Sequence, residues 1–321
     1  MTAKARLDVQ TTGRTRFGAL LSAAILLLLT ACGGSSSGSA AKPSGLPGAG
    51  KPTIILGDKN FDEEFLLGEL YAQAFRAKGY TVTLKSNIGG SELINTTFQS
   101  GQINAYPEYL GEVVASDARY EKPLESEAQT EMLAKQYEAA HGGAVMTPVT
   151  PFFDTDQLIT LKGYAQQHNL TSIEDLKGLG PVKLGDYAAE QTRYAGFVGL
   201  QQAYGLTNLE FVPLAAGAPI YAALDSKQVQ VGDAFSTDPQ LASGNYATLK
   251  DPKNIFGFQH VALIIKSSLL QQLGPEFQKT YEAVNALLTA DAMQALNKAV
   301  SIDKQTPTSV AHAFLAANHL A

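Results

Sequence analysis

Apolar residues along this chain alternate between strand-like and helix-like spacing. Short apolar runs predict buried strands, the first of them at residues 53–57, which end in Gly57. Residues 61–78 repeat apolar positions every three to four residues and stop at Gly79, which predicts a helix and its end. More strands are predicted at 80–84, 103–106, 182–185, 229–235 and 261–265, and more helices at 91–101, 125–141, 199–204, 219–225, 275–288, 291–299 and 309–320. Residues 161–176 are interpreted as an exposed connector, and Ser91 as a helix N-cap.

Strand and helix alternate in two blocks, which favours an α/β fold of two lobes with largely parallel sheets and a cleft between them. Ligands of open α/β sheets bind beyond the carboxyl ends of the strands. Tyr106 and Tyr109 follow a short predicted strand in the segment GQINAYPEYLGE. We therefore consider them candidates for an aromatic wall facing a ligand, with packing at a loop edge as the alternative.

The amino terminus has the pattern of an export signal. Four basic residues precede the apolar run 17–29, which is short for a permanent membrane span. Leu29-Thr30-Ala31-Cys32 then resembles the lipobox of bacterial lipoproteins, in which the cysteine receives the lipid. We expect residues 1–31 to be a lipoprotein signal peptide and Cys32 to be the lipidation site. An ordinary secretory leader with an incidental cysteine is the alternative.

The composition and charge of the chain limit the kinds of partner that it can bind. Residues 32–52 are rich in Gly, Ser, Pro and Ala, which predicts a flexible tether to the membrane surface. The full chain has a net charge of −6, and residues 1–31 carry four basic and one acidic side chain, so the remainder lies near −9. An acidic body without a basic cluster argues against nucleic acid as a partner. Cys32 is the only cysteine, so no disulfide can form within one chain.

Enzymatic motifs are absent from the sequence. The five histidines show no metal-ligand spacing, the chain has no Walker-type phosphate loop, and no G-x-S-x-G elbow joins a predicted strand to a predicted helix. Asp154 and Asp156 would share one face of a strand, so they could bind a cation or act in acid-base chemistry. We expect no metal, no cofactor and no catalysis. A two-lobed enzyme using Asp154, Asp156 or Glu112, and a surface adhesion protein, remain the alternatives.

Several stretches, taken in order, resemble the substrate-binding proteins of osmoprotectant ABC importers, which bind glycine betaine, choline, carnitine and related quaternary ammonium compounds. The resemblance covers the chain from about residue 53 to its end and is carried by these stretches: Asp58-Lys59-Asn60-Phe61, Asn87-Ile88-Gly89-Gly90, Tyr106-Pro107-Glu108-Tyr109, Arg193-Tyr194-Ala195-Gly196, Tyr221-Ala222-Ala223-Leu224, Phe235-Ser236-Thr237-Asp238 and Phe256-Gly257-Phe258-Gln259.

The resemblance implies a hinged, two-lobed periplasmic-binding-protein fold of type II. Lobe 1 would comprise residues 53–153 and 255–321, and lobe 2 residues 154–254. It further implies an extracytoplasmic, monomeric receptor that is anchored to the membrane through Cys32 and delivers its osmolyte to the membrane subunits of an ABC permease.

The resemblance also implies a ligand held among aromatic rings, because a quaternary ammonium ion cannot donate ordinary N–H hydrogen bonds and is attracted to ring faces. Carried over by position, the expected ligand-binding residues are Lys59, Gly89, Gly90, Tyr106, Tyr109, Glu112, Asp154, Asp156, Arg193, Tyr221 and Phe258. Among these, Lys59 and Arg193 would contact a ligand carboxylate, and the two glycines would let the backbone approach the ligand.

Departures from the family pattern affect the expected ligand. Glu112 stands where the family often has a hydroxyl, Asp156 where it often has a tyrosine, and Phe258 where it often has a tyrosine. Such a site should bind a simple betaine less well, and it could prefer choline or a larger polar or aromatic solute. Other interpretations are core packing for Tyr221 and Phe258, a turn cap for Lys59, and an ion pair of Arg193 with Asp186 or Glu190.

Overall fold

The computed structural model describes residues 45–321, which belong to one compact unit. The predicted signal peptide and Cys32 lie outside the described residues. Of the predicted tether, residues 45 and 47–50 lie in turns, and the Gly48 amide donates to the Lys78 carbonyl oxygen at 2.9 Å. No described helix has both the length and the apolar character needed to cross a membrane.

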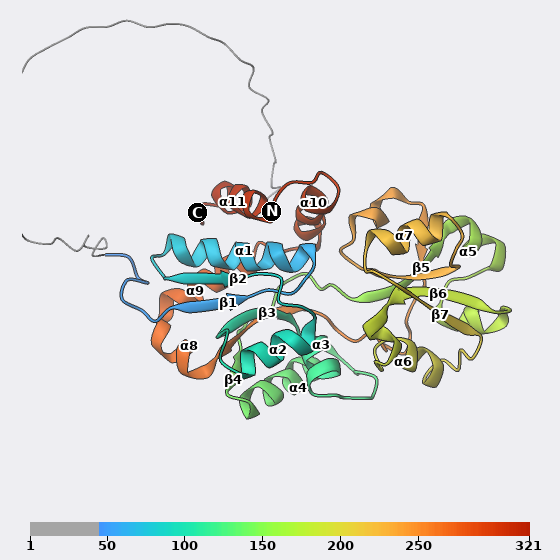
Figure 1. Cartoon of the computed structure of the whole chain (residues 1–321), viewed down its shortest axis with the longest axis horizontal. Helices are drawn as coiled ribbons and strands as arrows, with labels where there is room; N and C mark the ends of the chain where they lie inside the picture. The colour runs from blue at the N-terminus through green and yellow to red at the C-terminus, as the bar shows by residue number, and fades with distance from the viewer. Residues whose placement is uncertain (1–44) are drawn as a thin grey trace, which may run out of the picture. The chain divides into compact units, whose positions relative to one another are not determined.

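The first of two five-stranded sheets has the strand order β2-β1-β3-β10-β4 (Figure 1). Its strands are β1 (Ile54–Gly57), β2 (Val82–Lys85), β3 (Ala105–Tyr109), β4 (Gly143–Val145) and β10 (Val261–Lys266). β1 pairs in parallel with β2 and β3, whereas β10 is antiparallel to β3 and β4. The sheet is therefore parallel except for one reversed strand, β10, which enters from the far end of the chain.

The second sheet repeats this arrangement in the order β7-β6-β8-β5-β9. Its strands are β5 (Asp156–Leu161), β6 (Val182–Tyr187), β7 (Leu209–Leu214), β8 (Val231–Phe235) and β9 (Tyr246–Thr248). β6 is parallel to β7 and β8, and β5 is antiparallel to β8 and β9. We call residues 45–153 and 255–321 the first-sheet half, and residues 154–254 the second-sheet half.

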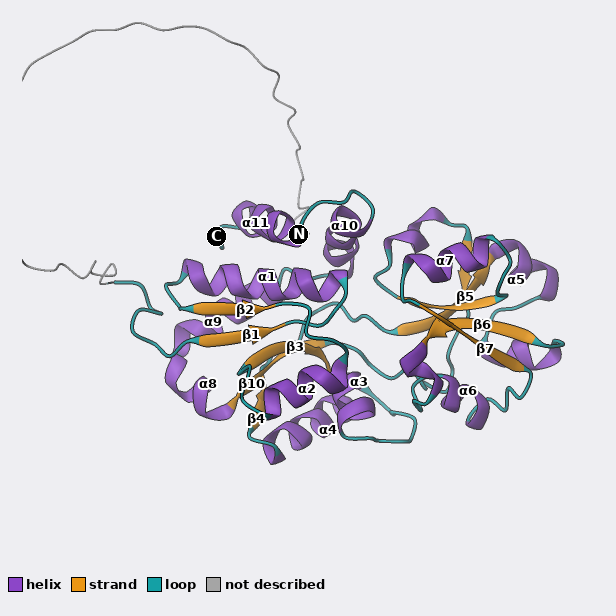
Figure 2. Ribbon diagram, viewed as in Figure 1, coloured by secondary structure: helices purple, strands orange, loops and turns teal. Residues whose placement is uncertain are grey.

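Helices cover both faces of each sheet (Figure 2). Those of the first-sheet half are α1 (Asp62–Ala77), α2 (Ser91–Gln99), α3 (Leu110–Glu112), α4 (Glu127–Ala140), α8 (Ser267–Leu273), α9 (Pro275–Asn285), α10 (Ala290–Ser301) and α11 (Pro307–Ala317). The second-sheet half has α5 (Lys162–His168), α6 (Phe197–Gln202) and α7 (Ala218–Asp225). A π-helical turn follows α3 at Val113–Asp117, and 3₁₀ turns lie at Ile173–Gly178, Ala188–Gln191 and Pro239–Ser243.

The inner strands of each sheet, such as β3, β8 and β10, are buried on both faces, as is usual where helices cover both sides of a sheet. In the first sheet, β10 sends Leu263 into the cluster around α1 and α9, and its neighbour Ile264 into the cluster around α2 and α4. In the second sheet, Leu158 and Ile159 of β5 divide between two clusters in the same way. This layering fixes the strand ends, and therefore the loops that follow them.

The structure differs from the local predictions at several places. The N-cap of α2 is Gly90, and Ser91 is the first helical residue, with its hydroxyl directed to Lys59 instead of a backbone amide. Residues 162–168, expected to be part of a connector, form helix α5. Strand β7 was not predicted, because only its first residue is buried and its sequence LEFVPL lacks a clear alternation.

Candidate functional site

Four aromatic side chains lie at the carboxyl ends of parallel strands from both sheets. Phe61 follows β1, Tyr109 ends β3, Tyr187 ends β6 and Phe235 ends β8. Phe61 stacks on Tyr109 with ring centroids 6.2 Å apart and on Phe235 at 6.0 Å, and Tyr187 lies 6.3 Å from Phe235. The rings therefore form a continuous group that joins the two halves.

These rings line a cavity of about 610 Å³. Its polar lining is Lys59, Asn60, Ser91, Glu92, Glu112, Asp154, Asp156, Arg193 and Gln259. The volume lies in the range of pockets that hold small organic molecules, and a mixed aromatic and charged lining is typical of such sites. The cavity occupies the position that ligands take in open α/β sheets, beyond the strand ends.

Lys59 lies at the base of this cavity and is 3% exposed. Its ammonium group donates to the Glu108 carboxylate and to the Ser91 hydroxyl at 3.3 Å, and lies 3.9 Å from Glu64. It also lies 4.4 Å from the centre of the Tyr109 ring. Burial lowers the pKa of Lys59, but Glu108 and Glu64 outweigh this effect and hold it above its ordinary value. Lys59 is thus a charged residue inside an ion-pair network.

Arg193 joins the two halves across the cavity. Its guanidinium lies 2.6 Å from Glu190 in its own half, and 2.7 Å from Glu92 and 3.2 Å from Glu112 in the first-sheet half. Of the pairings considered from the sequence, the one with Glu190 is confirmed. Glu112 is positioned in turn by Gln259, whose side-chain oxygen accepts from the Glu112 amide at 3.1 Å.

Asp154 and Asp156 both line the cavity at the entry to β5. Asp154 accepts from the Thr237 amide at 3.0 Å, and Asp156 accepts from the Tyr187 hydroxyl at 3.4 Å. Burial, and after it the Glu112 carboxylate, raises the pKa of Asp156 to about 6. Burial, followed by Glu63 and Asp238, raises the pKa of Asp154 well above its ordinary value.

Three more acids, Asp186, Glu190 and Asp233, are buried near Asp156 in the second-sheet half. Burial and then the Asp156 carboxylate raise the pKa of each of them well above its ordinary value. The Oδ1 atom of Asp233 is buried and has no hydrogen-bond partner among residues 45–321. The electrostatic environment on this side of the cavity therefore disfavours added negative charge.

Tyr106 and Tyr221, two predicted wall residues, do not line this cavity. The strand β3 continues through Pro107 to Tyr109, so side chains three residues apart point to opposite faces of the sheet. Tyr106 is consequently fully buried, with its ring 5.1 Å from that of Phe98. Tyr221 packs its ring on Tyr246, and its hydroxyl donates to Asp238 at 2.9 Å, as the core interpretation expected.

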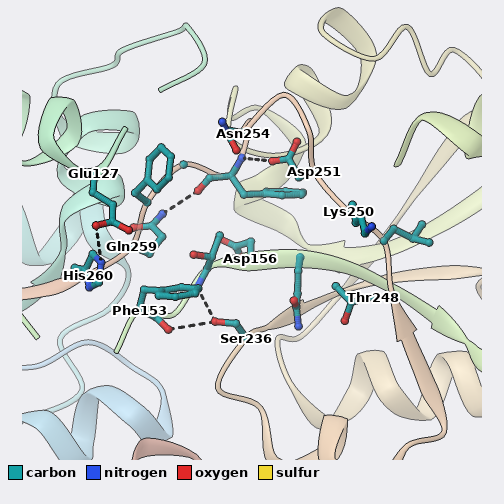
Figure 3. A pocket seen from close by; sticks show the side chains of 16 residues that line it. Glu127, Phe153, Asp156, Ser236, Thr248, Lys250, Asp251, Asn254, Gln259 and His260 are labelled. Atoms are coloured by element: carbon teal, nitrogen blue, oxygen red, sulfur yellow. Dashed lines mark hydrogen bonds and ion pairs between the residues drawn. The ribbon is translucent and has the colours of Figure 1, made fainter. Parts of the chain in front are cut away.

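Gly89 and Phe258 also differ from the prediction. Gly90 lines the cavity but Gly89 does not; Gly89 has φ +143°, a conformation that L side chains rarely adopt, so its role here is in the turn. Phe258 lines a second cavity of about 320 Å³, together with Phe153 and His260 (Figure 3). Asp156 and Gln259 line both cavities. The two cavities therefore lie on either side of the chain segments around these residues, where the chain crosses between the two halves.

Phe61, Tyr187 and Phe235 were not singled out as site residues from the sequence. Phe61 and Phe235 stand inside stretches that carried the family resemblance, and Tyr187 follows a predicted strand by two residues. An aromatic residue at or just after the end of a predicted parallel strand was the sequence signal that could have identified these three as cavity residues. The described histidines and acids include no group arranged to hold a metal ion.

A family model described as OpuAC, the substrate binding domain of an ABC-type glycine betaine transport system, matches residues 52–317. A glycine-betaine-binding protein of Pseudomonas aeruginosa is 29% identical over 280 residues, covering 84% of this chain and 88% of that protein. A permease and binding protein of Helicobacter pylori, named for ergothioneine transport, is 25% identical over 266 residues, covering 82% of this chain and 47% of that protein.

Solved structures share the fold. One described as a glycine betaine/carnitine/choline ABC transporter has a TM-score of 0.68 at 21% identity, covering 83% of this chain and 99% of that one. The lactococcal OpuAC structure, in a closed form with glycine betaine, has a TM-score of 0.60 at 16% identity, covering 84% and 97%. The predicted α/β fold of the periplasmic-binding-protein type is thereby confirmed.

Proposed function

The chain belongs to the family of substrate-binding domains of ABC-type glycine betaine transport systems, and we propose that it captures a quaternary ammonium osmolyte in the cavity among its four rings. The osmolyte would be of the glycine betaine, choline or carnitine type. The protein would then hand it to the membrane subunits of the permease, and it would act as a receptor without enzymatic activity.

The observation that supports this ligand class is the group of rings Phe61, Tyr109, Tyr187 and Phe235 around one cavity with acidic side chains. A ring face attracts a quaternary ammonium ion and makes apolar contact with its methyl groups, each pair contributing about 0.5–2 kcal/mol. Carboxylates nearby add attraction that does not depend on N–H donors.

Both halves contribute aromatic rings to the cavity, and this also supports a motion that closes the two lobes around a ligand. The proposed lobes are residues 53–153 with 255–321, and residues 154–254, and their strands fall on separate sheets. A ligand that contacts rings of both lobes favours the arrangement in which the lobes are close, so binding and closure are coupled. A permease can then distinguish the loaded receptor from the empty one.

The proposal places the receptor outside the cell membrane as a monomer, anchored through a lipid on Cys32. What supports the anchor is the sequence Leu29-Thr30-Ala31-Cys32 behind a basic and apolar leader. Replacement Cys32→Ser should release the protein from the membrane fraction without changing ligand affinity. Retention of the variant in that fraction would exclude the lipid anchor.

Binding is tested by calorimetric titration of the purified protein with glycine betaine, choline and carnitine. Tyr187→Ala and Phe235→Ala should each weaken binding at least about tenfold, since 1.4 kcal/mol corresponds to one decade. Tyr164→Ala, which removes a ring from α5 away from the cavity, is the matched control. Unchanged affinity in both cavity variants would contradict the proposed site.

A larger polar or aromatic solute is the second candidate. The cavity volume of about 610 Å³ favours it, because that volume lies within the range for drug-sized ligands. The Helicobacter pylori relative is named for ergothioneine, which gives a first compound to test. A thermal-shift screen with ergothioneine beside the three osmolytes separates the candidates, because the ligand that raises the melting temperature at the lowest concentration binds most tightly.

A further inference from the structure

Positive charge in the cavity is already neutralised by the protein itself. Lys59 and Arg193 are the lysine and arginine of its lining. Five carboxylates lie within ion-pair distance of these two cations: Glu64 and Glu108 around Lys59, and Glu92, Glu112 and Glu190 around Arg193. A ligand carboxylate would have to compete with these groups for either cation.

Asp154 and Asp156, in contrast, have no ion-pair partner among residues 45–321. Asp156 lies directly opposite Phe235 in the β5–β8 ladder, and its carboxylate contacts the Tyr187 hydroxyl. The Asp156 carboxylate is therefore next to two of the four rings. Figure 3 shows Asp156 from the side of the smaller cavity, near Gln259 and Phe153.

The surroundings of Asp156 strengthen its preference for a cation. Asp186, Glu190 and Asp233 are each at most 3% exposed, and all three interact electrostatically with Asp156. Like charges this close raise the free energy of every ionised member, and a cation in the cavity lowers it. A ligand carboxylate in the same place would raise it further.

The amino end of helix α2 also faces the cavity through Gly90 and Ser91, and such an end attracts anions. Glu92 lies in the first turn of this helix, and its carboxylate is held there by Arg193 at 2.7 Å. The protein thus supplies its own anion at this position as well.

From these contacts we propose that the cavity selects an organic cation with a neutral, hydrogen-bonding end, and discriminates against one that carries a carboxylate. Choline represents the first class and glycine betaine the second; they share a trimethylammonium group bonded to a methylene carbon, and that carbon bears a hydroxymethyl group in choline and a carboxylate in glycine betaine. Asp156 is the specificity-determining residue, because it holds the cation beside Phe235 and Tyr187. This inference rests on the proposed function and narrows its ligand.

Calorimetric titration of the wild-type protein with choline and with glycine betaine at pH 7.5 is the direct test. Choline should bind at least about tenfold more tightly. Betaine affinity equal to or above that of choline would overturn this inference while leaving the proposed function intact. If neither compound bound, this inference would fail, and the proposed function would fail with it only if carnitine did not bind either.

The role of Asp156 is tested by Asp156→Asn, which keeps the shape and removes the charge. Choline affinity should fall at least about tenfold, and betaine affinity should stay the same or rise, so that the preference shrinks or reverses. Asp291→Asn, which removes an exposed acid in the first turn of α10 outside the cavity lining, is the matched control and should change neither. Equal losses for both ligands would show a structural role of Asp156 and overturn its assignment.

A pH series provides a readout that a structural role would not produce. Because the pKa of Asp156 is raised to about 6, wild-type affinity for choline should fall as the pH decreases through 6. The Asp156→Asn variant should lose most of this dependence. A wild-type choline affinity that is constant between pH 5 and 7.5 would contradict the proposed charge interaction.

Discussion

Buried polar groups around β3 differ in how well they are satisfied. The Tyr109 hydroxyl donates to Glu63 at 2.7 Å, and Glu63 also accepts from Thr237 at 2.7 Å and from Asn297 at 2.6 Å. The Tyr106 hydroxyl, three residues earlier, is buried and has no hydrogen-bond partner in the portion that the structure describes. The same side-chain chemistry therefore contributes to stability at one position and not at the other.

A matched pair of substitutions tests this difference. Tyr109→Phe should lower the free energy of unfolding by about 1–3 kcal/mol, because a buried carboxylate loses one of three donors. Tyr106→Phe should be neutral or slightly stabilising, since it removes a hydroxyl that has no partner. Urea denaturation monitored by circular dichroism measures both, and the interpretation fails if Tyr106→Phe is the more destabilising.

Glu138 predicts a stability that depends on pH. It is fully buried, and neither of its carboxyl oxygens has a hydrogen-bond partner in the described part of the chain. Burial, followed by Glu108, raises its pKa to about 7. Because the folded-state pKa lies above the ordinary value, Glu138 contributes stability below about pH 4.5 that is lost as the pH rises through 7. The shift corresponds to on the order of 3 kcal/mol.

The variant Glu138→Gln cannot ionise, so its free energy of unfolding relative to wild type should rise between pH 4.5 and 8. Chemical denaturation at a series of pH values gives this difference. Buried acids that do not interact with Glu138 contribute equally to both proteins and cancel. Glu108 and Asp117 do interact with Glu138, so their contribution remains in the difference. A wild-type-minus-variant difference that does not change with pH would contradict the raised pKa.

At the scale of elements, local pattern was sufficient where a helix or strand carries its own signal. Helix α1 was predicted within one residue at each end, because its apolar stripe is regular and Gly79, at φ +83°, allows the chain to turn away. Strand β3 was predicted to end at Tyr106, and residues 107–109 were interpreted as the start of the loop that follows. In the structure β10 pairs with β3 through Tyr109, and a pairing partner about 150 residues away gives no local signal.

The site shows the same limit. Seven of the expected ligand-binding residues line the cavity, and their role in binding stays a prediction: Lys59, Gly90, Tyr109, Glu112, Asp154, Asp156 and Arg193. Whether Tyr106 or Tyr109 faces the cavity depends on the register of β3 in the sheet, and the pairing of β3 with β10 sets this register. Arg193 forms ion pairs with Glu92 and Glu112, which are distant from it in sequence. The sequence therefore could not show that the Arg193 guanidinium is already paired with carboxylates of the protein.

At the scale of the whole molecule, the Arg193 guanidinium is one of the links between the two halves away from the connecting segments. It bonds to Glu92 and Glu112, both in the first-sheet half. Thr237 makes a second link through its hydroxyl to Glu63. These contacts form without a ligand, so they should bias the molecule toward the arrangement in which the halves are close.

Arg193→Ala should shift this balance toward separated halves, because it removes both ion pairs and leaves three carboxylates near one another. The radius of gyration of the ligand-free protein, measured by small-angle X-ray scattering, should increase, and a saturating ligand should reverse the increase. Arg76→Ala removes an arginine that bonds only to the Val82 carbonyl oxygen in its own half and should leave the radius unchanged. If Arg193→Ala had no effect on the radius of gyration, Arg193 would serve only to hold Glu190 and Glu112 in place.

The ligand affinity of Arg193→Ala distinguishes a link between the halves from a group that binds a ligand carboxylate. Loss of a link between the halves should lower the affinity for every ligand by the same factor. Loss of a carboxylate-binding arginine should lower the affinity for glycine betaine alone.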